Sequence, residues 1–287
     1  MNSKNSNYTT GLHLRLTENL TTLVTEALEL GLPTFQFFLN QPKDSSYLKI
    51  SPGDLANFLH LKKQFSQPLF LHSSYWINPS TGDKIAFDSS KKLLNKEIRL
   101  AKKLEIPYLV LHAGSAKKYT EIKTDPHNKH QGIMTLAKML NTVLKNEQDI
   151  QILLENTAHG NKTIGSDLND FVLLRNELNN PEKINFCIDT AHAFAYGYDI
   201  AQTDTFIQTL DMTMGIHNIK LIHLNDSKEN LGTKRDVHGL PGDWKIGAQA
   251  LKNFIYHEKI KHLPKIIECP ATSKHDLERT LNNISNW

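Results

Sequence analysis

The chain has 287 residues and a formal net charge of +3, with 39% hydrophobic and 22% charged residues, as in ordinary soluble proteins. No apolar run reaches the ~20 residues of a membrane span, and the polar N-terminus lacks the apolar core of a secretory signal. Cys187 and Cys269 form no CxxC pair or disulfide framework, which indicates a reducing compartment. We expect a cytoplasmic protein with no membrane partner, whose mild basicity permits a polyanionic partner without requiring one.

Apolar runs of strand length alternate along the chain with segments of helical spacing. The predicted strands cover residues 11–16, 34–39, 68–73, 108–114, 149–156, 184–189, 219–226 and 265–270. The predicted helices cover residues 18–30, 51–65, 89–104, 132–146, 166–178, 204–213, 248–256 and 273–284. In the first helix, Leu20, Leu23, Val24 and Ala27 share one apolar stripe, and Gly31 follows as a stop signal.

Strict alternation of strands and helices requires a parallel sheet with right-handed crossovers. Eight such units favour a (β/α)8 TIM barrel, which typically takes about 250 residues. An open doubly wound sheet is the alternative, but the first strand is not followed by its usual glycine-rich loop. We expect one domain over residues 1–287, with residues 1–10 flexible. The polar stretch 117–132 reads as a solvated loop in which His127 and His130 are exposed.

Metal-binding residue types recur at the ends of the predicted strands. They are His72, His112, Glu155, Asp189, His223 and Glu268, and His192, Asp236 and His238 follow in nearby loops. Because the carboxyl ends of barrel strands open onto one face, these side chains should converge there. Carboxylates buried together are costly unless they are protonated, paired or bound to metal. The sequence therefore predicts a metal site at the C-terminal face of the strands.

The donor types and their number limit the chemistry of this site. Imidazole and carboxylate donors suit zinc, manganese or iron. A catalytic zinc commonly takes three protein ligands, so the candidates exceed one site and suffice for three with a shared carboxylate. Clustered metal ions suit phosphoryl chemistry, because they can hold both the attacking and the leaving oxygen.

Several stretches carry a resemblance to a known family. The most specific are IDTAHAFAYGYD and HLNDSK with the later DVH, and LHSSYWIN, LVLHAGS and LLENTA support them. From about His13 to Pro270 the chain resembles endonuclease IV, the zinc-dependent apurinic/apyrimidinic endonucleases of the xylose-isomerase-like TIM barrels.

The resemblance implies three zinc ions per chain, with Mn²⁺ or Fe²⁺ possible in some positions. The first would be held by His72, His112 and Glu155, and the third by His192, Asp236 and His238. Glu155 would be the bridging catalytic carboxylate, shared with a second ion that Asp189, His223 and Glu268 also hold. A metal-bound hydroxide would attack the phosphorus 5′ to an abasic sugar in double-stranded DNA. The products would be a 3′-hydroxyl and a 5′-deoxyribose phosphate.

The DNA contacts are less well defined by sequence. Tyr75 matches a family position whose ring enters the duplex, although packing within its loop is an equal alternative. Asn40 and Gln41 match a DNA-facing loop, and the basic residues Lys228 and Arg235 are expected to contact phosphates. The chain departs from the family pattern at Pro42, at His159, and in the segment GLPGDWK before Ile246. These departures leave lesion preference open.

Two other functions remain at this stage. A metal-dependent sugar isomerase or epimerase of the same superfamily would use fewer ligands and give His192, Asp236 and His238 no evident role. A metal-stabilised DNA-binding protein with little turnover would keep the ligands without catalysis. We expect a monomer in each case.

Overall fold

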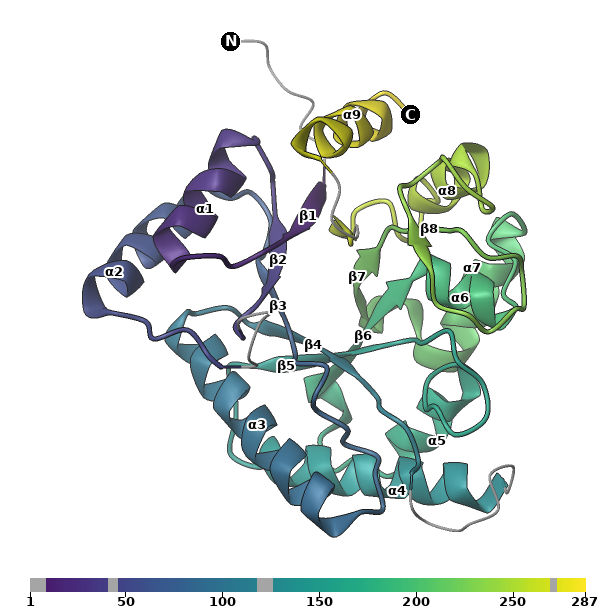
Figure 1. The fold of residues 1–287 in the computed structure, drawn as a ribbon. Helices are drawn as coiled ribbons and strands as arrows, with labels where there is room; N and C mark the ends of the chain where they lie inside the picture. The colour runs from purple at the N-terminus through teal and green to yellow at the C-terminus, as the bar shows by residue number, and fades with distance from the viewer. Residues whose placement is uncertain (1–8, 41–45, 118–125, 269–272) are drawn as a thin grey trace.

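The computed structural model describes residues 9–40, 46–117, 126–268 and 273–287, and within them the predicted fold is confirmed. Eight parallel strands of these ranges close a barrel in the order β1-β10-β7-β6-β5-β4-β3-β2, with helices around the outside (Figure 1). The residues Gln41, Pro42 and Cys269, named from the sequence, lie outside the described residues.

Every predicted barrel strand is present, most of them shorter than expected. They are β1 (Thr10–Leu14), β2 (Phe35–Phe38), β3 (Phe70–His72), β4 (Tyr108–His112), β5 (Gln151–Glu155), β6 (Ile184–Asp189), β7 (Ile219–His223) and β10 (Lys265–Ile267). Thr10, which we expected to belong to a flexible segment over residues 1–10, is buried and begins β1 beside Lys265 of β10. Residues 1–8 lie outside the described ranges.

The predicted helices are present with shifted ends. They are α1 (Leu20–Glu29), α2 (Pro52–Leu61), α3 (Lys84–Lys103), α4 (Pro126–Val143), α5 (Asn169–Asn176), α7 (Thr203–Met214), α8 (Ala248–Ile255) and α9 (Lys274–Ser285). The Asp83 side chain caps α3 by accepting from the Ala86 N–H, so this helix starts well before residue 89. The expected loop 117–132 is wrong from Pro126 onward, where α4 begins. His127 and His130 are exposed there as predicted.

A short helix and a two-stranded hairpin near the barrel mouth were not predicted. The short helix α6 (Thr190–Tyr196) follows β6 directly, with Asp189 as its N-cap. The expected strand 219–226 divides: β7 ends at His223, and Asp226 opens β8 (Asp226–Ser227), which pairs antiparallel with β9 (His238–Gly239). Only two residues pair on each strand, and this short pairing joins the two ends of the loop between β8 and β9.

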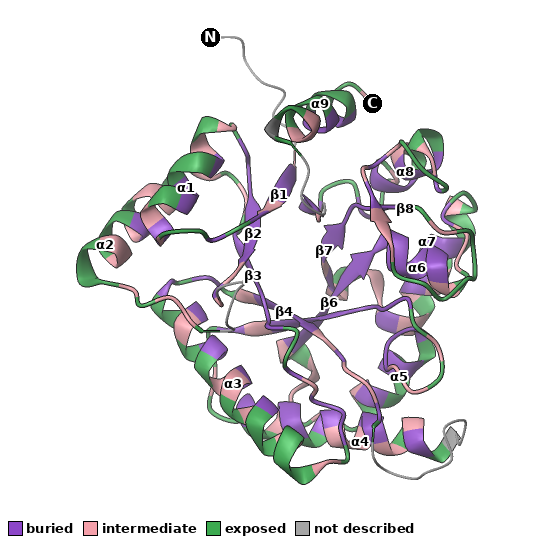
Figure 2. Cartoon of the chain, in the orientation of Figure 1, coloured by how far each residue is buried: buried purple, intermediate pink, exposed green. Residues whose placement is uncertain are grey.

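Alternation along the strands builds two apolar layers. A small cluster fills the barrel interior, with one residue from each of six strands: Phe70, Val110, Leu153, Cys187, Leu221 and Ile266. A larger core lies between the strands and the helices, whose outer faces are exposed (Figure 2). Side chains two residues apart on a strand share a face, so each strand carries a candidate ligand two residues beyond its interior residue. The interior cluster is therefore the apolar floor of the candidate site.

None of the helices in the described ranges combines the length and the apolar character that crossing a bilayer requires.

Candidate metal centre

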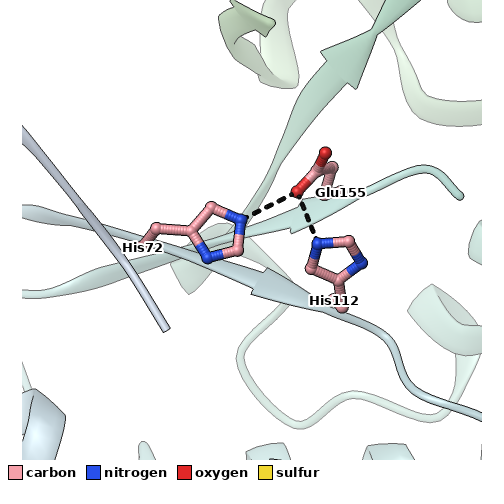
Figure 3. Close-up of side chains that lie close together, drawn as sticks. All are labelled: His72, His112 and Glu155. Carbon is pink, nitrogen blue, oxygen red and sulfur yellow. Dashed lines mark hydrogen bonds and ion pairs between the residues drawn. The ribbon is translucent and has the colours of Figure 1, made fainter. Parts of the chain in front are cut away.

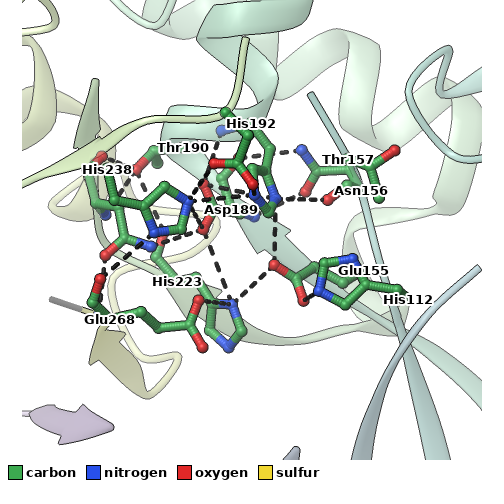
Figure 4. A network of polar contacts seen from close by, with 12 residues as sticks. His112, Glu155, Asn156, Thr157, Asp189, Thr190, His192, His223, His238 and Glu268 are labelled. Atoms are coloured by element: carbon green, nitrogen blue, oxygen red, sulfur yellow. Dashed lines mark hydrogen bonds and ion pairs between the residues drawn. The ribbon is translucent and has the colours of Figure 1, made fainter. Parts of the chain in front are cut away.

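The strand register brings the predicted ligands together at the C-terminal mouth of the barrel. Three groups of side chains could each hold a metal ion, with ligand atoms within 4.8 Å of one another inside each group. The groups are His72 with His112 and Glu155; Glu155 with Asp189, His223 and Glu268; and Asp189 with His192 and His238. Figure 4 shows how these side chains, from different strands and loops, point toward one another.

Glu155 lies between two of the groups. Its Oε2 is 3.1 Å from His72 Nε2 and 3.2 Å from His112 Nε2 (Figure 3). Its other oxygen, Oε1, is 3.1 Å from His223 Nδ1. The carboxylate is fully buried at the end of β5, so its two oxygens serve opposite sides of the site. This is the geometry that a bridging carboxylate needs.

The third group is assembled from the two unpredicted elements. His192 comes from α6 and His238 from β9, and their Nε2 atoms are 3.2 Å apart. Asp236 lies beside both, with its oxygens 3.1 Å from His192 Nε2 and 3.1 Å from His238 Nε2. Asp189 also reaches this group, since its Oδ2 is 3.6 Å from His238 Nε2. The sequence placed Asp189 with the second group, and the structure sets it between the second and the third.

In four of the histidines, one ring nitrogen lies within hydrogen-bond distance of a carbonyl oxygen. The pairs are His72 Nδ1 with Ser73 O at 2.8 Å, His192 Nδ1 with Asn156 O at 2.9 Å, His223 Nε2 with Gln36 Oε1 at 3.0 Å, and His238 Nδ1 with Glu268 O at 3.4 Å. A carbonyl can only accept, so the nitrogen facing it carries the proton, and the other nitrogen keeps its lone pair for a metal. Outer contacts of this kind orient metal-binding histidines, and the donor set therefore fits bound metal ions.

The sequence analysis missed the residues that hold these ligands in place. Gln36 on β2 donates from Nε2 to Glu268 Oε1 (2.7 Å), and the His13 ring contacts the same oxygen from β1 (3.1 Å). Asn225 donates to Asp189 Oδ2 (2.6 Å) and accepts from the Glu268 N–H (2.8 Å). The polar Gln36 inside an otherwise aromatic run, FQFF, was the available signal for one of them.

Opposing charges shift the acidities of the cluster. Burial alone would raise the pKa of Glu155, but His112 and His223 hold it well below its ordinary value. Burial opposes protonation of His238, yet Asp189 and Asp236 raise its pKa to about 9. His112 has less carboxylate around it, and burial lowers its pKa to about 4. The carboxylates of the cluster therefore favour positive charge beside them, whether it comes from protonated histidines or from metal cations.

Four of the residues predicted to face DNA, Tyr75, Asn40, Lys228 and Arg235, lie in described segments that follow β2, β3 and β8. Tyr75 is 74% exposed as a residue, and the centroid of its ring lies 5.9 Å from those of both His72 and His112. Asn40 forms a bridge with Tyr47 across the loop after β2. Lys228 and Arg235 are exposed in the loop between β8 and β9, where Arg235 lies 3.3 Å from Glu229.

Two exposed tryptophans near these loops were not singled out from the sequence. Trp76 follows Tyr75 and is 71% exposed, and Trp244 in the segment GLPGDWK is 46% exposed. His159, another departure from the family pattern, is exposed and its Nδ1 contacts the carbonyl oxygen of Lys234 at 3.2 Å.

The fold and the site define a metal-binding enzyme of the xylose isomerase-like TIM barrels. The model of that family matches residues 24–286. The probable endonuclease 4 of Thermosipho melanesiensis is 31% identical over 281 residues, which cover 95% of this chain and 96% of that protein. The probable endonuclease 4 of Nitrosopumilus maritimus is 31% identical over 272 residues, 93% of this chain and 95% of its own.

Solved structures agree. The crystal structure of endonuclease IV from Thermus thermophilus superposes with a TM-score of 0.82 at 27% identity and covers 98% of each chain. A D-tagatose 3-epimerase-like protein shares the fold with a TM-score of 0.68 at 17% identity, over 96% of this chain and 98% of its own. The chain belongs to the endonuclease IV family, and by that membership it is a nuclease.

Proposed function

We propose that this protein is an apurinic/apyrimidinic endonuclease that hydrolyses the phosphodiester bond 5′ to an abasic site in double-stranded DNA. The observation that carries the proposal is the set of nine histidine and carboxylate ligands in adjoining groups at one barrel mouth. Family membership over nearly the whole chain supports the same reading. The products would be a 3′-hydroxyl and a 5′-deoxyribose phosphate.

The ligand sets would hold three zinc ions, with Mn²⁺ or Fe²⁺ possible in some positions. His72, His112 and Glu155 would form the first set; Glu155, Asp189, His223 and Glu268 the second; His192, Asp236 and His238 the third. Bound ions supply activation of water and neutralisation of charge on the reacting phosphate and the leaving oxygen. The chain itself supplies no general base in this scheme.

The role of the protein is to position the ligands and to exclude bulk water. Glu155 presents one oxygen to each of two sets, and Gln36 and Asn225 fix Glu268 and Asp189 from behind. The apolar floor under the ligands keeps the dielectric low, which strengthens electrostatic stabilisation of a developing charge. Catalysis then rests on groups held in place before the substrate arrives.

Recognition of the substrate would come from the loops around the mouth. The exposed Tyr75 residue would fill the gap left by the missing base, Asn40 and Gln41 would also contact the DNA, and Lys228 and Arg235 would contact phosphates. We also propose that the chain acts as a monomer with a single barrel domain in the cytoplasm. The monomer is checked by light scattering of the purified protein.

A gel assay tests the function. The purified protein, loaded with zinc, is incubated with a duplex that carries one abasic site and a label at the 5′ end of the lesion strand. We expect a single cut 5′ to the lesion, and a primer end that a DNA polymerase extends directly. The matched duplex without the lesion should remain intact. An absence of cleavage by a folded protein with about three metal ions per chain would refute the proposal.

Metal analysis separates the proposed nuclease from a sugar isomerase or epimerase on the same barrel. The isomerase alternative predicts one or two ions, because it has no use for His192, Asp236 and His238. The nuclease predicts that Asp236→Asn lowers the metal content by about one ion and also slows cleavage. Cleavage by wild type also excludes a DNA-binding protein without turnover.

A further inference from the structure

The segment GLPGDWK departs from the family pattern, and its conformation is fixed by one buried carboxylate. Asp226, at the start of β8, accepts hydrogen bonds from the backbone N–H groups of Ser227, Gly242, Trp244, Ile246 and Gly247 at 2.7 to 3.2 Å. Its side chain is fully buried. Charge-assisted bonds of this kind are strong, so the segment is held as one rigid turn rather than as a free loop.

This turn places Trp244 against β9, the strand that carries the candidate ligand His238. The indole packs on the backbone of Gly239, where a Cβ atom would overlap Trp244 Cδ1. Gly239 directly follows the candidate ligand His238 on β9. Trp244 as a whole residue remains 46% exposed to solvent. A flat apolar surface therefore lies against β9, on the face of the strand opposite to the His238 side chain, because neighbouring residues of a strand point to opposite faces.

A cation stands over the same ring. Lys228 Nζ lies 4.9 Å from the Trp244 ring centroid, within the range of a cation–π contact. The Lys228 N–H donates to Val237 O at 2.9 Å and the Lys245 N–H to Ser227 O at 3.0 Å, so β8 and β9 set this geometry through the backbone. The nearest acid in the turn, Asp243, is paired with Arg279 at 3.5 Å. The surface thus joins a positive charge to an aromatic face.

We propose that Trp244 and Lys228 together bind one nucleotide of the DNA strand next to the cleavage site. The ammonium group takes the phosphate and the exposed indole packs on the apolar face of the nucleoside. This inference rests on the proposed function and adds a contact next to the strand that carries His238, whereas Tyr75 lies beside His72 and His112. Single-stranded and unstacked nucleotides are commonly held by this combination of aromatic ring and cation. Because the ring is already fixed by the turn, little conformational entropy is lost on binding.

The test uses metal-loaded protein and an abasic duplex, with binding, kcat, KM and metal content measured for each variant. Trp244→Ala should weaken binding and raise KM about tenfold, a change of about 1.4 kcal/mol that lies within the range for base–aromatic stacking. The value of kcat and the metal content should stay near wild type. Trp244→Phe should recover most of the affinity, because it keeps a flat ring.

Two controls distinguish a DNA contact from a structural one. Trp244→Leu keeps an apolar cover over Gly239 without a ring, and it should behave like Trp244→Ala. Tyr256→Ala removes an aromatic residue of similar exposure, 49%, at the end of α8 that points away from the metal face, and it should match wild type. Wild-type affinity in Trp244→Leu, or loss of metal and kcat without a change in KM for Trp244→Ala, would overturn the inference. Failure of the proposed function looks different, because wild type itself would then leave the abasic duplex uncut.

Discussion

At the residue scale, Glu155 is the ligand that we expect to tolerate substitution least. Its two oxygens contact histidines on opposite sides, and no neighbouring carboxylate among the described residues does the same between the first and second groups. Glu155→Gln keeps size and shape but removes the charge and one acceptor. We expect more than about 100-fold loss of cleavage, beyond the 10- to 100-fold typical of residues that only support a ligand.

The measurement is single-turnover cleavage with metal content determined on the same sample. Gln36→Leu is the matched control, since it removes a supporting residue with no ligand role and should lose less activity. Near-normal turnover and full metal content in folded Glu155→Gln would contradict the bridging role.

Tyr75 tests lesion recognition at the same scale. An abasic site is poorly stacked, so an aromatic ring can enter it more easily than an intact duplex. Tyr75→Ala should therefore weaken binding to abasic duplex about tenfold and to intact duplex much less. Lys228→Ala should weaken both and reduce the salt dependence by about one phosphate contact. Paired titrations at several salt concentrations give both answers, and equal losses on the two duplexes for Tyr75→Ala would remove it as the lesion probe.

At the element scale, helix α3 connects the segments after β2 and β3, which carry the proposed DNA contacts Asn40 and Tyr75, through a single carboxyl group. Glu97 Oε1 accepts from the Tyr47 hydroxyl at 2.7 Å and from the Ser74 N–H at 3.1 Å. Tyr47 pairs with Asn40 in the loop after β2, and Ser74 precedes Tyr75 in the loop after β3. Glu97 Oε2 is buried with no hydrogen-bond partner in the described part of the chain, and burial raises the pKa of the group to about 7.

This raised pKa predicts a pH dependence of folding. The folded protein binds the Glu97 proton more tightly than the unfolded chain, whose ordinary value is 4.5. The group therefore favours folding below about pH 4.5, and that contribution is lost as the pH rises through about 7. The size is on the order of 3 kcal/mol at most. Glu97→Gln should gain stability relative to wild type between pH 5 and pH 8, measured by denaturant unfolding at equal metal content. A difference that does not change with pH would refute the assignment.

Strand patterns in the sequence predict some of the candidate ligands but not the elements that carry the third set. His72, His112, Glu155, Asp189 and His223 were predictable because alternation along a buried strand places each at the barrel mouth. The grouping of the third set was available only from the family resemblance. Its members lie on α6, the loop before β9, and β9, none of which the apolar pattern predicts. These short elements are fixed by side-chain bonds, such as the Asp189 cap and the Asp226 contacts, that pairwise sequence spacing does not encode.

At the scale of the whole molecule, metal binding and proton binding compete for the same cluster. A histidine must be neutral to bind a metal, so acid lowers affinity most where its pKa is highest. His192 and His238 both have raised pKa values, with Asp189 the leading carboxylate beside each, and that of His238 is about 9. Each of the other two groups has a single histidine with a raised pKa, His72 in the first and His223 in the second, and burial lowers the pKa of His112 in the first group to about 4. The groups should therefore lose metal at different pH values.

We expect acidification from pH 8 to pH 5 at buffered free zinc to release the metal of His192, Asp236 and His238 first. Metal content should fall from about three to about two per chain before the melting temperature drops sharply, because the later ions contribute most to the linked stability. Asp236→Asn provides the matched comparison: it should begin near two ions and lack the first step. The sign follows from the raised histidine pKa values, since protons held more tightly by the empty site must be displaced by each ion. Loss of all ions in one step, or an unchanged first step in Asp236→Asn, would show that the three groups titrate as one unit and that the third set has no separate affinity.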